Sequence, residues 1–285
     1  MADISAADVK KLREKTGAGP MECKKALQDS DGDFDKAEKL LKEKGLAAVE
    51  KRAGRATNEG KIFVRIKDDG SCAALVELAS ETDFVARNPE FIELGGLIAQ
   101  LALEKGYTES NEELSGMVTS LATKIRENMS LKRLKTLKAS AGEYLTSYIH
   151  GDGAIGVVVK LAADNPEAIQ KEEVKALAFN LALHIAAFNP LALDRTKIDG
   201  AYLKEQEEIF RKQMELDENL SKKPANVIDN ILKGKISKYL QEICLLEQGF
   251  VKDEKLPVAE VLNETGKQAG AKLSVADYAY FKVGE

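Results

Sequence analysis

The sequence predicts an α+β protein in which helical segments are combined with antiparallel β-hairpins. Residues 61–67 and 72–79 alternate apolar and polar side chains around a turn at 68–70, which is the pattern of a hairpin. Residues 143–150 and 154–162 repeat that pattern around a turn at 151–153. The remaining apolar residues follow helical spacing, and the 285-residue chain is 44% hydrophobic and 31% charged with six prolines. We expect a helix-rich globular protein of about two domains.

The first 45 residues predict three short helices. Ser5, with an acidic residue three positions on, is a helix cap, and the glycines at 17–19 separate the first helix from a second that starts at Pro20. The turn at 31–33 caps a third helix, which we expect Gly45 to end in the left-handed conformation. Residues 46–58 are then expected to form a helical or flexible linker whose basic side chains are solvated.

The two hairpins belong to an internal repeat. The turn glycines Gly70 and Gly153 lie 83 positions apart, whereas the tripeptides Asn-Pro-Glu at 88–90 and 165–167 lie 77 apart, each ahead of an apolar helix. This difference predicts about six extra residues, 82–87, in the first copy. The corresponding connection in the second copy is short and has Asp164 where the first copy has an aromatic residue. We therefore interpret Phe84 as exposed and not as a side chain that fills the core. Asp83 and Phe84 are therefore predicted to form a projecting prong that binds a partner.

Three further segments complete the chain. Residues 111–141 predict helices, with the basic run Lys132, Arg133, Lys135 and Lys138 interpreted as the solvated face of one of them. Residues 199–231 predict a helical hairpin inserted into the second copy, with its turn around 221–224. This hairpin is either a partner-binding or oligomerisation arm or a helix pair packed on its own domain. Residues 273–283 predict a closing strand.

Most sequence motifs that would indicate an enzyme lack the neighbouring residues or secondary structure that the motif requires. Residues 151–156 match the dinucleotide motif GxGxxG, but the following valines predict a strand where that motif needs a helix. The dipeptide Gly266-Lys267 lacks the second glycine and the hydroxyl of a phosphate-binding loop. No metal-ligand cluster or nucleophile arrangement emerges, and we expect neither catalysis nor a cofactor.

The cysteines, the net charge and the apolar runs of the chain restrict its cellular compartment and its partners. The three cysteines, Cys23, Cys72 and Cys244, have no paired spacing, which favours buried thiols in a reducing compartment. The formal net charge of −5 gives no overall attraction for nucleic-acid phosphates. Without a signal peptide or a long apolar run, we expect a cytoplasmic protein that has no contact with a membrane. His184, on an apolar helix, is interpreted as a hydrogen-bonded core residue.

Several motifs together resemble a known family. The segments at residues 12–19 and 21–27 resemble the N-terminal signature of bacterial elongation factor Ts, and residues 82–87 resemble its second signature. Residues 147–150 with 155–157, residues 184–187 and residues 242–248 extend the resemblance over nearly the whole chain. The chain departs from some members at Pro20, where they carry Met.

The resemblance implies a guanine nucleotide exchange factor for elongation factor Tu. It implies that the GDP-bound or nucleotide-free partner is recognised and that magnesium is displaced from it by a loop containing Thr82, Asp83, Phe84 and Val85. Further partner contacts are implied at Leu12, Arg13, Gly19 and Met21, and at His150. Neither an enzymatic role nor direct nucleic-acid binding is implied, and a homodimer is one expectation for the arm.

The resemblance also divides the chain. Residues 1–55 would form a three-helix, ubiquitin-associated-like domain with its linker, and residues 56–141 the first core half. Residues 142–198 and 232–285 would form the second half, interrupted by a coiled-coil or dimerisation module at 199–231. Two other functions remain open: an adaptor that binds proteins without accelerating nucleotide release, and a nicotinamide-dependent enzyme that uses residues 151–156.

Overall fold

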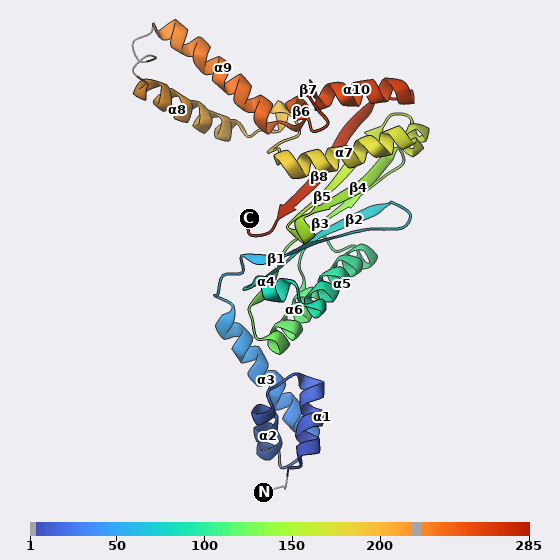
Figure 1. Cartoon of the computed structure of the whole chain (residues 1–285), viewed down its shortest axis with the longest axis vertical. Coiled ribbons are helices and arrows are strands. Elements are labelled where there is room, and N and C mark those ends of the chain that lie inside the picture. The colour runs from blue at the N-terminus through green and yellow to red at the C-terminus, as the bar shows by residue number, and fades with distance from the viewer. Residues whose placement is uncertain (1–3, 218–219, 221–223) are drawn as a thin grey trace.

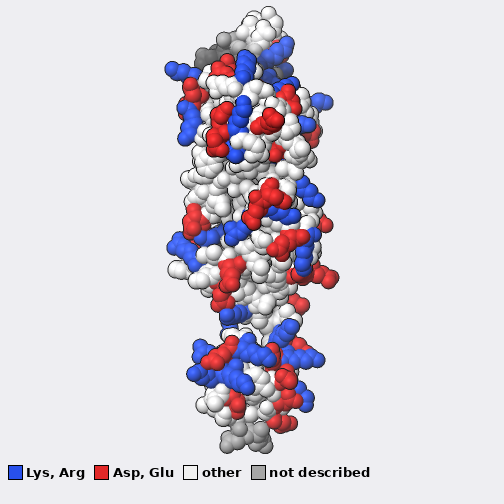
Figure 2. Space-filling view, turned by 90° about the vertical axis from the view of Figure 1, so that its right-hand side faces the viewer, with Lys and Arg blue, Asp and Glu red and all other residues white. Residues whose placement is uncertain are grey.

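A computed structural model describes residues 4–217, 220 and 224–285. It confirms the α+β class: a three-helix unit, two three-stranded antiparallel sheets with covering helices, and a projecting helix pair follow one another along the long axis (Figure 1), and β6 and β7 form a further two-stranded pair. Positive and negative side chains are interspersed on the face seen in Figure 2, where a constriction separates the three-helix unit from the rest.

The helices and strands are as follows. The α-helices are α1 (Ala6–Thr16), α2 (Pro20–Asp29), α3 (Phe34–Arg52), α4 (Asp83–Ala86), α5 (Pro89–Lys105), α6 (Glu112–Ile125), α7 (Glu172–Phe188), α8 (Gly200–Leu216), α9 (Ala225–Ile243) and α10 (Val258–Ala269). The short 3-10 helices are η1 (Gly151–Gly153), η2 (Pro166–Gln170), η3 (Arg195–Lys197) and η4 (Leu245–Glu247). The strands are β1 (Glu59–Ile66), β2 (Cys72–Ser80), β3 (Met129–Lys138), β4 (Glu143–His150), β5 (Ile155–Ala163), β6 (Gly249–Phe250), β7 (Asp253–Pro257) and β8 (Leu273–Lys282).

The N-terminal helices begin and end at the predicted signals. The Ser5 hydroxyl accepts a hydrogen bond from the Asp8 backbone at 3.1 Å, and Asp33 accepts one from the Lys36 backbone at 3.1 Å. Gly17 ends α1 with φ of 68°, a left-handed conformation that glycine adopts without a steric penalty. These caps fix the turns between helices that bury a small common core around Leu12 and Leu27.

The prediction that Gly45 ends the third helix is wrong. Helix α3 continues through it to Arg52, so only residues 53–58 connect the three-helix unit to β1. A Cβ on Gly45 would lie 2.3 Å from Cγ2 of Thr123 on α6. This glycine therefore allows α3 and α6 to approach closely, which is a tertiary requirement and not a helix stop.

The two sheets pack face to face, with helices on their outer sides (Figure 1). The first sheet has the strand order β1-β2-β3, and the second has the order β4-β5-β8, with all pairs antiparallel. Helices α5 and α6 cover the first sheet, and α7 and α10 cover the second. A third apolar cluster between the sheets includes Ile62, Leu75 and Val158. The predicted closing strand is confirmed as β8.

The internal repeat is present, but the register predicted beyond the hairpins is wrong. Strands β2 and β5 begin and end 83 positions apart, and so do helices α5 and α7. The bulges between Glu77 and Leu78 and between Lys160 and Leu161 keep the same offset. Asn88 caps α5, whereas Asn165 caps the short helix η2, and α7 starts only at Glu172. The two connections are equally long, so residues 82–87 are not an insertion.

The predicted basic helix face at residues 132–138 is also wrong, because this segment is strand β3. Its pairing with β2 skips Lys132 at a bulge opposite Glu77 and Leu78. Leu131 and Leu134 consequently contact the same core although they are three residues apart, a spacing that imitates a helix. Arg133 is only partly exposed and pairs with the buried Glu77 at 2.5 Å.

The helical hairpin is longer than predicted. Its second helix, α9, continues past residue 231 to Ile243, and the pair projects away from the sheets (Figure 1). Tyr202 and Tyr239 are hydrogen-bonded through their hydroxyls near the base, and the Phe210 ring lies 5.5 Å from that of Tyr239. The predicted turn at 221–224 lies mostly outside the described residues.

Candidate partner-binding site

The candidate site is a single helical turn, α4, that follows strand β2. Thr82 caps it, since its hydroxyl accepts a hydrogen bond from the Val85 backbone at 3.4 Å. The next residues differ sharply in exposure: Phe84 is 80% exposed, whereas Val85 and Ala86 are 6% and 4% exposed. Burial of these two residues against the α5–α6 core fixes the backbone that presents Phe84 to solvent.

Phe84 is exposed, as predicted, although the reason given for it was wrong. At the repeat offset of 83 positions, the buried pair Val85 and Ala86 corresponds to the buried pair Ala168 and Ile169. Phe84 corresponds to the exposed Glu167. An aromatic ring thus occupies a position where the second copy places a solvated carboxylate, on the same kind of short helical connection.

Charged side chains lie on the α4 turn and on the neighbouring turn η1. Asp83 forms an ion pair with Arg87 at 3.0 Å along the turn. Across β1, the ammonium group of Lys61 lies 2.5 Å from Asp152 on the turn η1 of the second half. The hydrogen bond and charge of Lys61 lower the pKa of Asp152, and the charge of Arg87 lowers it further. The α4 turn of the first half and the η1 turn of the second are therefore electrostatic neighbours.

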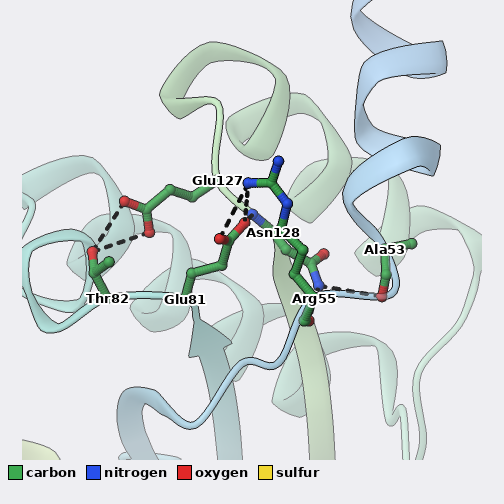
Figure 3. Close-up of polar contacts among 6 residues, drawn as sticks. All are labelled: Ala53, Arg55, Glu81, Thr82, Glu127 and Asn128. Carbon is green, nitrogen blue, oxygen red and sulfur yellow. Dashed lines mark hydrogen bonds and ion pairs between the residues drawn. The ribbon is translucent and has the colours of Figure 1, made fainter.

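A polar network holds the base of the turn (Figure 3). The Thr82 hydroxyl donates to the Glu127 carboxylate, with both oxygens at 3.0 Å. Glu81 accepts a hydrogen bond from the Asn128 backbone at 2.6 Å and pairs with Arg55 at 3.4 Å. Sequence reasoning missed Glu127 and Asn128, because their partners are far away in the chain and no local motif marks them.

The N-terminal residues predicted to bind a partner lie in different environments. Met21 is 75% exposed and Arg13 is exposed, so both are accessible. Leu12 is fully buried in the three-helix core, and Gly19 caps α2 through its backbone N–H, which donates to Glu22 at 2.9 Å. That hydrogen bond is the largest cause of the lowered pKa of Glu22. Leu12 and Gly19 support the helices that carry the exposed residues and offer no side chain to a partner.

His150 lies at the exposed end of β4. Its Nδ1 is 3.0 Å from the Tyr148 hydroxyl, and the Tyr148 ring meets Phe179 edge-on at 6.0 Å. Phe179 is 43% exposed and lies on the same face as Tyr148 and His150, whereas Ile149, 44% exposed, precedes His150 on the strand and points to the opposite face of the sheet. Sequence reasoning missed both, although an aromatic residue at a solvent-facing helix position is a recognisable signal.

The other histidine has the predicted core role. His184 is fully buried, and its Nδ1 accepts a hydrogen bond from the Val251 backbone at 3.2 Å. A neutral imidazole has one donor nitrogen, so Nε2 donates to Gln248 Oε1 at 2.9 Å. Burial lowers the pKa of His184, and the hydrogen bond to Gln248 partly opposes this effect.

The dinucleotide motif is a hairpin turn, as its context predicted. Strand β5 follows it at Ile155, and a Cβ on Gly156 would lie 2.4 Å from Cγ2 of Ile62 in the other sheet. Gly156 therefore serves sheet packing. The three cysteines are free and buried. Among the described residues, no group of three His, Cys, Asp or Glu side chains is placed to hold a metal ion, and no helix is long and apolar enough to span a membrane.

Comparison with known proteins identifies the family. The family described as "Elongation factor TS" matches residues 81–285. Elongation factor Ts of Treponema denticola is 53% identical over 283 residues, which cover 99% of each chain. The proteins of that name from Treponema pallidum and Clostridium acetobutylicum are 46% and 41% identical, with 99% of this chain covered and 99% and 93% of theirs. The chain that presents Phe84 on the α4 turn belongs to the elongation factor Ts family.

Proposed function

We propose that this chain is a guanine nucleotide exchange factor for elongation factor Tu. It would bind the GDP-bound partner, promote GDP release and leave a nucleotide-free complex to which GTP rebinds during protein synthesis in the cytoplasm. The observation that carries this proposal is the 80% exposure of Phe84 on a turn whose neighbouring residues are buried. An exposed aromatic ring on a fixed backbone is suited to enter a partner's pocket with little loss of conformational freedom.

The mechanism that we propose is displacement of the partner's magnesium ion. In GTPases this ion bridges the nucleotide phosphates and the residues that hold them, so dislodging it weakens GDP binding without covalent chemistry. Phe84 would enter beside the ion and Asp83 would accompany it. Thr82 would cap the turn and the buried Val85 would fix its backbone, so that both hold Asp83 and Phe84 in position. This role needs no cofactor and no catalytic residue in the chain itself.

Phe84 alone cannot supply the free energy for GDP release. A nucleotide bound at nanomolar affinity is held by roughly 12 kcal/mol, whereas burial of one Phe provides only about 1.5–3 kcal/mol. A wide interface must provide the rest. We assign Arg13 and Met21 of the three-helix unit to it, together with His150 and the exposed Phe179 on the same face of the sheet. The coupling is reciprocal, so GDP weakens binding of the factor as much as the factor weakens binding of GDP.

Two other parts of the chain receive proposed roles. The three-helix unit, residues 1–55, would be a ubiquitin-associated-like module that docks on the partner's nucleotide-binding domain. The projecting pair α8–α9 would be a second contact arm or a dimerisation module, which agrees with its position away from the sheets (Figure 1).

The test is release of fluorescently labelled GDP from elongation factor Tu, with and without the full-length chain. Exchange activity predicts that release accelerates in proportion to the added chain until the partner is saturated. An adaptor would form a complex with elongation factor Tu while GDP leaves at its spontaneous rate. Binding without acceleration would therefore exclude the proposed function and support the adaptor.

A further inference from the structure

The turn between α6 and β3, residues 126–128, contacts three separate parts of the molecule through three consecutive residues. Arg126 pairs with Glu22 on α2 of the three-helix unit. Glu127 accepts the hydrogen bond of Thr82, which caps the turn carrying Phe84. Asn128 holds the connection that joins the three-helix unit to β1, as Figure 3 shows.

Asn128 makes the largest number of these contacts. Its side-chain amide donates to the carbonyl oxygens of Ala53 at 3.3 Å and Arg55 at 2.7 Å. Its backbone N–H donates to Glu81 at 2.6 Å, one residue before the cap of α4. The residue is only 7% exposed, so its polar groups depend on these partners and not on water.

The contacts of Asn128 form a closed loop. Arg55, whose carbonyl oxygen Asn128 binds, returns through its guanidinium to the Glu81 carboxylate at 3.4 Å. The connection and the base of the Phe84 turn are thus bound both to Asn128 and to each other. A displacement of residues 53–55 would therefore act directly on Glu81, the residue before the cap of α4.

We propose that Asn128 is a positioning residue that fixes Phe84 relative to the three-helix unit, so that docking of this unit places the ring at the partner's nucleotide site. This proposal rests on the proposed exchange function. Two contacts held at a fixed separation reinforce each other, because the second then forms at a high effective concentration. Without Asn128, docking continues but Phe84 reaches its site less often.

The test measures GDP release from elongation factor Tu over a range of concentrations of the full-length chain. Asn128→Ala should lower the maximal release rate about fivefold or more, while the half-saturating concentration changes less than twofold. Asn128→Asp should behave similarly, because a carboxylate facing two carbonyl oxygens cannot donate. Glu81→Gln keeps the shape, removes the charge paired with Arg55, and should give a smaller loss of the maximal rate.

Asn165→Ala is the matched control. Asn165 caps η2 in the second half, and its loss removes a hydrogen bond to the Glu167 backbone far from residues 53–55 and 81–87. The control should exchange at the wild-type rate. If Asn165→Ala and Asn128→Ala lower the rate equally, the effect of Asn128 is general loss of stability and the proposal is wrong.

A double variant of Asn128 and Phe84 distinguishes a positioning role of Asn128 from a general loss of stability. In a Phe84→Ala background there is no ring to position, so adding Asn128→Ala should lower the maximal rate by less than about twofold. A further fivefold loss in that background would overturn the proposal, as would a wild-type rate for Asn128→Ala alone. If Phe84→Ala itself exchanges normally, the proposed prong mechanism fails, and this outcome is distinct from failure at Asn128.

Discussion

Phe84 and Val85 are adjacent residues with opposite expected roles, so they provide the sharpest test of the site. Phe84→Ala removes a ring that is 80% exposed, and the free energy of unfolding should change by less than about 0.5 kcal/mol. Val85→Ala removes two methyl groups from a side chain that is 6% exposed in the α5–α6 core. It should lower the free energy of unfolding by roughly 2 kcal/mol through lost burial and the cavity that remains.

The exchange rates should change in the opposite order. If the ring is buried in the partner only when GDP leaves, its loss withdraws about 1.5–3 kcal/mol from that step. At 1.4 kcal/mol per tenfold change, this corresponds to release that is about 10- to 150-fold slower. Complex formation, which uses Arg13, Met21 and the surface around His150, should weaken much less.

The assay combines urea unfolding of each variant with stimulated GDP release at saturating concentration. Wild-type release by Phe84→Ala would refute the prong mechanism. Destabilisation of Phe84→Ala as large as that of Val85→Ala would show that the ring contributes to the core, contrary to its exposure.

Three further outcomes follow from the fold. Deletion of residues 82–87 should strongly lower the melting temperature, because it removes the buried Val85 and Ala86 and shortens a connection that contains no extra residues. An unchanged melting temperature would contradict the equal length of the two connections. Stability should fall as pH drops below about 6.5, because the unfolded chain then protonates His184 while burial keeps the folded pKa lower. In urea midpoints at pH 7.5 and 5.5, His184→Gln should reduce this fall, and an undiminished fall in that variant would contradict the assignment to His184. Arg133→Leu should cost about 3 kcal/mol in urea unfolding, because it leaves the fully buried Glu77 carboxylate with only the Lys132 ammonium group, 3.9 Å away, as a cationic partner among the described residues. Adding Glu77→Leu should recover part of this free energy of unfolding, and a double variant no more stable than Arg133→Leu would exclude the unpaired carboxylate as the cause.

Local signals predicted the parts of the fold that local chemistry determines. Ser5 and Asp33 cap helices because their side chains reach backbone N–H groups three residues on. The hairpin turns could be predicted because glycines such as Gly70, with φ of 70°, adopt left-handed conformations easily. The exposure of Phe84 was predicted from the comparison of the two repeat copies, whose register was wrong, so no local signal determined it.

Three of the errors and omissions arose where a distant residue decides the structure. Gly45 has the sequence context of a helix stop, but its role depends on Thr123, which lies 78 positions further along the chain. The bulge at Lys132 is visible only when β3 is paired with β2. Asn128 could not be identified because its partners lie 47 to 75 positions away.

The corrected register changes how the difference between the two halves is understood. Both halves join a central strand to a covering helix through connections of equal length, each containing one short helical turn. Both turns are anchored by two adjacent buried residues, Val85 and Ala86 in one and Ala168 and Ile169 in the other. The backbone that presents Phe84 is therefore a general feature of the repeat and needs no separate source of stability. What distinguishes the first half is the ring in place of Glu167, together with the polar contacts of Thr82 and Glu81 that connect its turn to residues 127 and 128 and, through Arg55, to the end of the three-helix unit.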